Sequence, residues 1–161
     1  MEYVPRQTVV QPSIIDRLLD DAPDNPQLDS TQHFDLPRLK AALARDLEAL
    51  LNTRIVDLTD QLSDFPEADR SMLQFGIPDL SGLSLLNPDH REMLRERLRK
   101  AIEQHEPRLG GVRVSLDAPR ELERHLRFRV DAILTVHPHR PPVMFDATLQ
   151  LSSNVYQVNG N

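Results

Sequence analysis

The sequence predicts an α+β domain in which helices pack on one face of a small, mainly antiparallel three-stranded sheet, with a separate amphipathic helix near the N-terminus. Two long segments before residue 106 repeat apolar residues at helical spacing, and three segments after residue 109 alternate apolar and polar residues as strands do. The chain of 161 residues has no Trp and 4% aromatic residues, so we expect a core of Leu, Val and Ile. This length suits one well-cored domain with tails.

The N-terminal part is predicted to contain a short amphipathic helix. Its apolar residues lie at helical spacing: Ile14, Ile15, Leu18 and Leu19. A helix of about ten residues is marginal alone in water, so this stripe must dock on another surface. The chain's own domain and a partner protein are equally good candidates for that surface, because a linker-like stretch, residues 22–34, follows the helix. We therefore divide the chain into a tail, residues 1–34, and a main domain, residues 35–161.

Two long helices are predicted in the main domain. The first begins after Asp35, a favourable N-cap, and ends at about Asn52, a residue that tolerates the left-handed C-terminal position. The second begins after Asn87 and ends at about His105, because the residue before a proline is pushed out of the helical region. Each helix carries an apolar stripe for the core: Leu36, Leu39, Leu43, Leu47 and Leu50 in the first, and Met93, Leu94, Leu98, Ala101 and Ile102 in the second.

The stretch between these helices, residues 53–86, shows no sustained periodicity. Prolines and glycines interrupt its short apolar runs: Pro66, Gly76, Pro78 and Gly82. A connection of this length in a compact domain is usually functional or disordered. We expect a long, partly ordered connection that offers a surface which a partner orders.

Three strands are predicted after the second helix, at residues 112–116, 126–136 and 143–151. Tyr156 and Val158 are expected to extend the last of them. Their short connections favour an antiparallel meander. A three-stranded sheet cannot close on itself, so at least one edge keeps unpaired backbone groups and is a template for a strand of another chain.

Composition excludes several classes of function. The net charge of −6 and the pI of about 5.5 argue against binding to nucleic acid or to an anionic lipid surface. The first thirty residues contain no long uncharged apolar run, so we expect no signal peptide, no membrane insertion and a cytoplasmic location. The absence of cysteine excludes disulfides, thiolate zinc sites and cysteine nucleophiles.

No group of residues predicts catalysis or a cofactor. His137 and His139 flank a proline, but two histidines are too few for zinc, and an exposed proline-rich hairpin explains them better. The dispersed histidines lack a nearby serine or cysteine nucleophile motif, and no pair of carboxylates is singled out for acid–base work. We therefore expect no catalytic residues, no metal site, no cofactor and no enzymatic activity.

The most unusual local motif is Glu106-Pro107-Arg108 at the end of the second helix. The proline ends the helix and is expected to direct the two charged side chains outward on a stiff turn. Two interpretations are equally supported by the residues. The motif is a helix stop with a local ion pair, worth under about 1 kcal/mol if exposed, or it is a rigid charged pair presented for recognition.

Four segments, in this order, resemble the TssE family of type VI secretion baseplate wedge subunits: Ser13 to Asp21, Arg45 to Arg54, Gln74 to Leu80, and Glu106 to Leu109. The resemblance spans residue 13 to about residue 156. The family also includes phage tail baseplate wedge proteins, some of them once labelled lysozyme-like.

This resemblance implies a similar α+β fold and a structural role in a cytoplasmic baseplate. The implied partners are the other wedge components TssF, TssG and TssK, together with sheath subunits whose polymerisation the sheet edge seeds by strand pairing. The motif Glu106-Pro107-Arg108 is the family's hallmark. The residues expected to bind partners are therefore Glu106, Pro107, Arg108, Ile14, Ile15, Leu18 and Leu19. The alternative function, from the former label, is a peptidoglycan-degrading lysozyme-like hydrolase.

Overall fold

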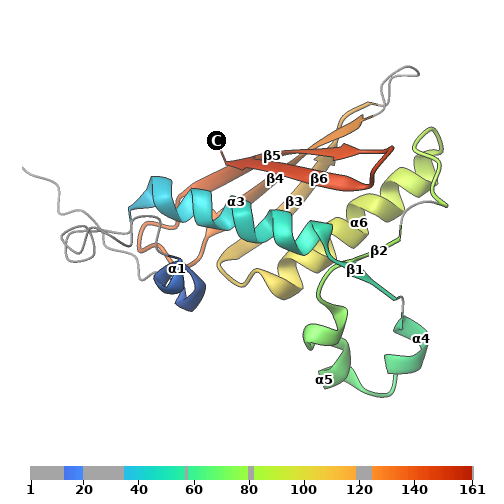
Figure 1. Ribbon diagram of the computed structural model, residues 1–161, viewed down its shortest axis with the longest axis horizontal. Helices are drawn as coiled ribbons and strands as arrows, with labels where there is room; N and C mark the ends of the chain where they lie inside the picture. Colours follow the sequence, from blue (N-terminus) through green and yellow to red (C-terminus); the bar gives the residue numbers. More distant parts are fainter. Residues whose placement is uncertain (1–12, 20–34, 57, 80–81, 119–124, 161) are drawn as a thin grey trace, which may run out of the picture.

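The computed structural model describes residues 13–19, 35–56, 58–79, 82–118 and 125–160. The predicted linker, residues 22–34, lies outside the described residues. The main body has two layers, a β-sheet and a layer of two long helices, α3 and α6, that lie on the same side of the sheet (Figure 1). The α+β class is therefore as predicted.

The two long helices occupy the predicted segments. Helix α3 is Leu36–Asn52 and helix α6 is Pro88–His105. Asp35 caps α3, because its side chain accepts the N–H of Arg38 at 3.0 Å. Asn87 caps α6 in the same way, with the N–H of Asp89 at 2.8 Å. Both helices have a proline in the first turn, where no helical hydrogen bond is lost.

The sheet has four antiparallel strands in the order β3-β4-β5-β6, so the prediction of three strands was wrong. The strands are β3 Leu109–Leu116, β4 His125–Leu134, β5 Pro142–Gln150 and β6 Val155–Gly160. Tyr156 and Val158 do not extend β5 but belong to the fourth strand. A turn reverses the chain after β5, and within it Asn154 adopts a positive φ of 53°, which asparagine tolerates better than most residues.

The core lies between the sheet and the two helices. It contains the inward members of each strand's alternation and the predicted leucine stripes: Leu39, Leu43, Leu47 and Leu50 of α3; Leu94, Leu98 and Ile102 of α6; Val112, Val114, Phe128, Val130, Phe145, Leu149 and Tyr156 of the sheet. Tyr156 and Phe128 pack edge to face with ring centroids 6.0 Å apart. The core is mainly aliphatic, as the composition predicts, with a few rings at the sheet.

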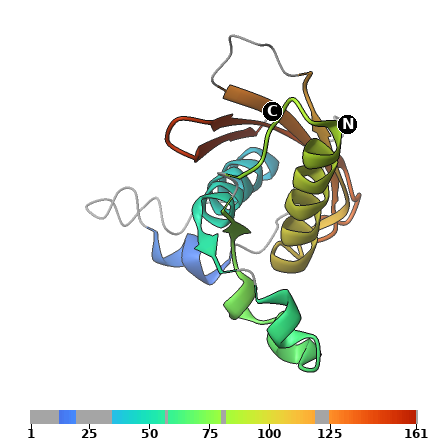
Figure 2. The same cartoon turned by 90° about the vertical axis from the view of Figure 1, so that its right-hand side faces the viewer.

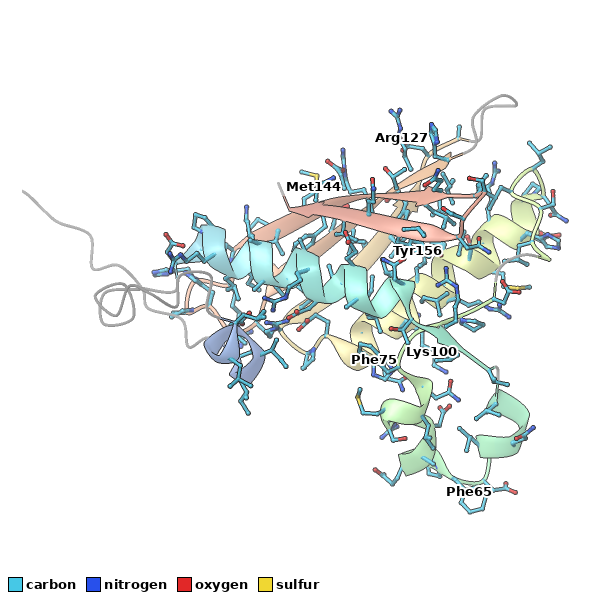
Figure 3. All side chains as sticks on the ribbon, in the orientation of Figure 1. Phe65, Phe75, Lys100, Arg127, Met144 and Tyr156 are labelled. Atoms are coloured by element: carbon cyan, nitrogen blue, oxygen red, sulfur yellow. The ribbon has the colours of Figure 1, made fainter. Side chains whose placement is uncertain are left out.

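The opposite face of the sheet carries the polar members of the alternation. Arg127 and Met144 project from this face, away from the helices (Figure 3). Arg129 of β4 pairs there with Asp146 of β5 at 3.0 Å. Among the described residues, no helix covers this face in either view (Figures 1 and 2).

The described residues between α3 and α6 contain more regular structure than expected from the sequence. They contain two short parallel strands, β1 Arg54–Ile55 and β2 Ile77–Pro78, and three short helical turns, α4 Thr59–Leu62, α5 Pro66–Asp69 and η1 Met72–Gln74. The three turns form a lobe that projects from the main body, and we call Thr59–Gln74 the projecting lobe (Figure 2). It is attached to the end of α6, where His105 Nε2 lies 2.8 Å from the carbonyl oxygen of Gln74.

Among the described residues, none of the helices is both long and apolar enough to cross a membrane.

Candidate partner-binding site

The turn Glu106-Pro107-Arg108 joins α6 directly to β3. The N–H of Glu106 still donates to the carbonyl of Ile102 at 2.8 Å, so Glu106 is the C-cap and the helix ends at His105, as predicted. Thr135, just after β4, holds the turn from the neighbouring strand. Its N–H donates to the carbonyl of Arg108 at 2.9 Å, and its hydroxyl donates to the carbonyl of Pro107 at 3.0 Å. The turn is therefore fixed by the sheet as well as by the helix.

The two charged side chains of the turn face each other rather than outward, so the expected outward orientation was wrong. Glu106 is 5% exposed, and it is the one buried polar or charged residue among those that the structure describes. Its Oε1 accepts from Arg108 Nε at 2.7 Å and from the Arg108 backbone N–H at 3.2 Å, and its Oε2 accepts from Nη2 at 2.5 Å. Such a two-point pair fixes both side chains because a guanidinium and a carboxylate match in shape.

Arg108 also contacts α3. The same Nη2 atom donates to Asp46 Oδ2 at 2.5 Å, so one guanidinium joins two carboxylates from distant parts of the chain. The hydrogen bond to Glu106, together with the bond to Asp46, raises the pKa of Arg108 despite partial burial. Arg108 is therefore cationic near neutral pH.

The pairing continues through Asp46 to the N-terminal helix α1, Ile14–Leu18. Asp46 Oδ1 accepts from Arg45 Nη2 at 2.8 Å and from its Nε at 3.0 Å. Arg45 Nη2 in turn donates to Asp16 of α1 at 2.7 Å. We call the series Asp16, Arg45, Asp46, Arg108 and Glu106 the ion-pair chain.

The N-terminal end of the ion-pair chain is part of a capping box. Asp16 Oδ2 accepts from the N–H of Ser13 at 3.0 Å and from its hydroxyl at 2.7 Å, while the N–H of Asp16 donates to Ser13 Oγ at 3.1 Å. Burial acts to raise the pKa of Asp16, but the hydrogen bonds from Ser13 and Arg45 outweigh it, so the pKa lies below its ordinary value. Asp16 is consequently ionised near neutral pH.

The apolar residues of the N-terminal helix are directed away from the main body. Ile14 and Leu18 are 76% and 75% exposed, and Ile15 and Leu19 are also exposed, whereas the Asp16 side chain is only 4% exposed. This is the reverse of the usual amphipathic arrangement, in which the apolar side packs inward. The sequence left two candidate surfaces for this apolar stripe, the chain's own domain and a partner protein. The described residues of the chain do not cover the stripe.

The structure thus joins two predicted groups of site residues that lie more than eighty residues apart in the sequence. Sequence reasoning missed the three residues that connect them, Asp16, Arg45 and Asp46. Arg45 and Asp46 are adjacent charges within an otherwise leucine-rich helix, and this is the signal that could have drawn attention to them.

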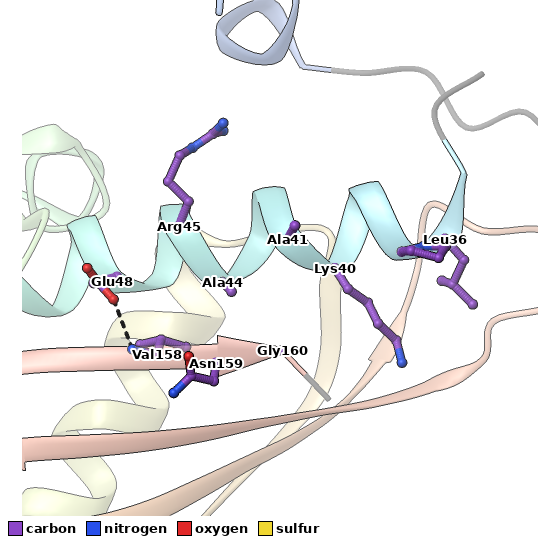
Figure 4. A pocket seen from close by; sticks show the side chains of 10 residues that line it. Leu36, Lys40, Ala41, Ala44, Arg45, Glu48, Val158, Asn159 and Gly160 are labelled. Carbon is purple, nitrogen blue, oxygen red and sulfur yellow. Dashed lines mark hydrogen bonds between the residues drawn. The ribbon is translucent and has the colours of Figure 1, made fainter. Parts of the chain in front are cut away.

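The two edges of the sheet differ. On β6 the outward backbone groups meet side chains of α3: Asn52 bonds both the N–H and the C=O of Tyr156, at 2.8 and 2.9 Å, and Glu48 accepts the N–H of Val158 at 2.9 Å. Farther along this edge a groove of about 660 Å³ lies between α3 and the end of β6, with Lys40, Ala41 and Ala44 on one side (Figure 4). Side chains of α3 therefore occupy much of the β6 edge.

Within the described residues, the β3 edge has no comparable closure. The N–H of Asp117 donates to the carbonyl of Arg127 at 2.9 Å, which fixes the phase of the β3–β4 ladder. Because the hydrogen-bonded pairs of an antiparallel ladder alternate, the backbone groups of Val114 and Leu116 point away from β4. Within the described part of the chain, β4 is the one strand that pairs with β3. The predicted open edge of the sheet is therefore at β3.

The histidine pair has a local structural role. The rings of His137 and His139 lie 5.6 Å apart between their centroids, and His137 Nδ1 accepts the N–H of His139 at 3.2 Å. In the residues that the structure describes, no three potential metal-binding side chains come together. The pair fits a turn between β4 and β5 better than it fits a metal site.

The fold and this site define an α+β domain in which charged side chains pair with one another and apolar side chains of α1 are exposed, and exposed apolar groups of this kind mark surfaces for protein–protein interaction. The chain matches the family described as baseplate wedge protein gp25 over residues 37–139. It belongs to this family. The match covers α3, the projecting lobe, α6, the Glu106-Pro107-Arg108 turn, and strands β3 and β4. None of the curated proteins searched matches the chain.

Proposed function

We propose that this chain is a wedge subunit of the cytoplasmic baseplate of a type VI secretion machine, where it binds other wedge subunits and helps to start sheath assembly. The observation that carries the proposal is the difference between the two edges of the sheet. Side chains of α3 bond the backbone of β6, whereas the described residues provide no strand beside β3 other than β4. Membership of the gp25 family supports the baseplate role. In this role the chain acts by binding, without a catalytic step.

Two exposed apolar surfaces suit the wedge partners TssF, TssG and TssK. The first is α1, with its apolar side directed outward. The second is the projecting lobe, on which Phe65, Met72 and Leu73 are exposed, and Phe65 lies at its far end (Figure 3). Exposed apolar groups gathered on small projecting elements are typical of sites that become buried in an assembly.

The β3 edge suits a sheath subunit. An extended segment that pairs with Val114 and Leu116 would continue the antiparallel sheet as a fifth strand. The direct test is Val114→Pro, which removes one outward N–H while the ladder to β4 keeps its bonds. We expect this variant to fold, as measured by circular dichroism, and to lose sheath assembly. Normal assembly by the folded variant would exclude β3 as the pairing edge.

Binding to the wedge partners is tested by co-purification with TssF and TssG. The intact chain should co-purify with both, and the chain without residues 1–30, which lacks α1, should bind them at least ~10-fold more weakly because a buried apolar contact is worth a few kcal/mol. Unchanged binding by the truncated chain would show that α1 does not dock on these partners.

The alternative hydrolase receives no support from the family match or from the site. Both oxygens of Glu106 accept hydrogen bonds from Arg108, so neither faces a substrate. A turbidity assay on cell walls separates the two functions. We expect no lysis, and lysis that Glu106→Gln abolishes would refute the scaffold role.

A further inference from the structure

The position of α1 is not explained by its own stability or by apolar packing. It has five residues, far fewer than a helix needs to be stable alone in water. Its apolar side chains are exposed, so their burial does not hold it. Among the described residues, the hydrogen bond that connects its side chains to the main body is the one between Asp16 and Arg45. Figure 4 shows Arg45 pointing from α3 toward α1.

The ion-pair chain has a regular arrangement in which each arginine joins two carboxylates. Arg45 Nη2 donates to both Asp16 and Asp46, at 2.7 and 2.8 Å. Arg108 Nη2 donates to both Asp46 and Glu106, at 2.5 Å each. Asp46 stands between the arginines and uses a different oxygen for each of them. A change in the pairing of one arginine therefore alters the hydrogen bonds that Asp46 can accept from the other arginine.

We propose that the ion-pair chain is a latch in which Arg45 holds α1 against α3, and Asp46 couples that hold to the Glu106-Pro107-Arg108 turn. Arg45 and Asp46 are positioning residues: they set the orientation of α1 and of Arg108. Because coupling between two sites is reciprocal, a ligand or partner that engages the turn changes the hold on α1, and one that engages α1 changes the turn. This is a property of the free chain, and it stands whether or not the proposed partners are correct.

The hold on α1 is measured with a spin label. The natural chain has no cysteine, so Leu18→Cys gives a single labelling site on an exposed position of α1. In the otherwise unchanged protein the label should report restricted motion. Arg45→Met and Asp16→Asn should each give the fast motion of a free peptide, and Asp16→Glu, which keeps the carboxylate, should restore the restriction.

Two matched controls distinguish loss of the bond between Asp16 and Arg45 from the effect of removing an exposed arginine and from the effect of weakening α1 itself. Arg95→Met removes an arginine that pairs with Glu92 and Glu96 on the exposed side of α6, and it should leave the label unchanged. Ser13→Ala removes the cap of α1 but keeps Asp16 opposite Arg45, so most of the restriction should remain. The proposal is overturned if Arg45→Met leaves the label restricted, or if Ser13→Ala frees it as fully as Arg45→Met does.

The coupling is measured at the other end of the latch. The Nε–H of Arg108 donates to Glu106 and gives its own nitrogen-15 NMR signal, whose exchange with water reports the closure of the turn. Asp46→Asn should free the label on α1 and raise this exchange rate at least ~10-fold, because local openings set exchange rates. Arg45→Met should raise the rate by a smaller factor. If Arg45→Met frees α1 while the Arg108 signal exchanges as before, the two ends are independent and the coupling is refuted.

Discussion

The loss in free energy of unfolding when the pair between Glu106 and Arg108 is broken distinguishes a buried, stabilising ion pair from an exposed one. Arg108→Met keeps most of the side-chain volume and removes the charge, which leaves the Glu106 carboxylate, 5% exposed, without its cation. Removing one partner of a fully buried pair costs about 3–5 kcal/mol. The Arg108 side chain is 18% exposed and that of Asp46 is 28% exposed, so water screens part of the loss. We therefore expect about 2–3 kcal/mol of destabilisation.

The double variant Glu106→Gln with Arg108→Met makes the test sharper. It removes both charges, so no uncompensated carboxylate remains, and we expect it to lose only about 1–2 kcal/mol, less than the single variant Arg108→Met. A double variant more stable than one of its parents shows that the two residues interact strongly.

The measurement is urea unfolding followed by far-ultraviolet circular dichroism, because the chain has no Trp to serve as a fluorescent probe. The midpoint should fall while the slope stays constant, which shows that stability rather than denatured-state compactness has changed. Arg95→Met, at an exposed pair, is the control and should cost under about 1 kcal/mol. A loss of that same small size for Arg108→Met would refute the argument and restore the interpretation from sequence in which the motif is an exposed ion pair worth under about 1 kcal/mol.

Three further variants or conditions test other parts of the structure. Gly76→Ala should destabilise the chain by about 1–3 kcal/mol in the same urea assay, because Gly76 has a φ of 136° and an added Cβ would lie 2.5 Å from the carbonyl oxygen of Thr53. Tyr156→Phe should be neutral or stabilising by up to about 1 kcal/mol in thermal melts, because the buried hydroxyl has no partner among the described residues. A clear loss of stability would reveal a partner for that hydroxyl. The label at position 18 should become mobile as the pH falls below the ordinary aspartate value of 3.8, and Asp16→Asn should abolish this pH dependence. The folded-state pKa of Asp16 is lowered, so its stabilising contribution is complete above that value and is lost as the pH falls through the folded-state pKa.

Elements that depend on local chemistry could be predicted from the sequence. The caps Asp35 and Asn87, the proline in the first turn of each long helix and the stop before Pro107 all act within a few residues, and all are found where they were expected. The strands β3, β4 and β5 follow from their alternation in the same way. Such signals are read without knowing which distant segments meet.

The fourth strand was missed because its signal is weak. Val155–Gly160 has only two buried side chains, Tyr156 and Val158, and so resembles a tail that continues β5. What makes it a strand is its pairing with β5 and the side chains of Asn52 and Glu48 on α3. Those helix residues lie about a hundred positions earlier in the chain, and no local pattern links them to it.

The ion-pair chain could not be predicted for the same reason. Glu106 and Arg108 were expected to point outward because a turn after a proline usually places charged residues in water. Asp46 reverses that orientation, and only the packing of α3 beside the turn brings it within 2.5 Å of Arg108. Sequence identified both ends of the site as unusual, but their connection is a property of the tertiary structure.

The burial of the pair between Glu106 and Arg108 also limits how the Glu106-Pro107-Arg108 turn can act in assembly. A carboxylate whose oxygens both accept from Arg108 has little to offer a partner directly. If the turn matters for assembly, its effect must pass through Arg108, which retains a partly exposed side chain, or through Asp46 and Arg45 to α1. These routes give opposite results for Asp46→Asn, which removes the carboxylate of the second route and keeps both Glu106 and Arg108 in the chain. Loss of wedge binding in a folded Asp46→Asn chain would favour the route through α1, and unchanged binding would favour direct contact at Arg108.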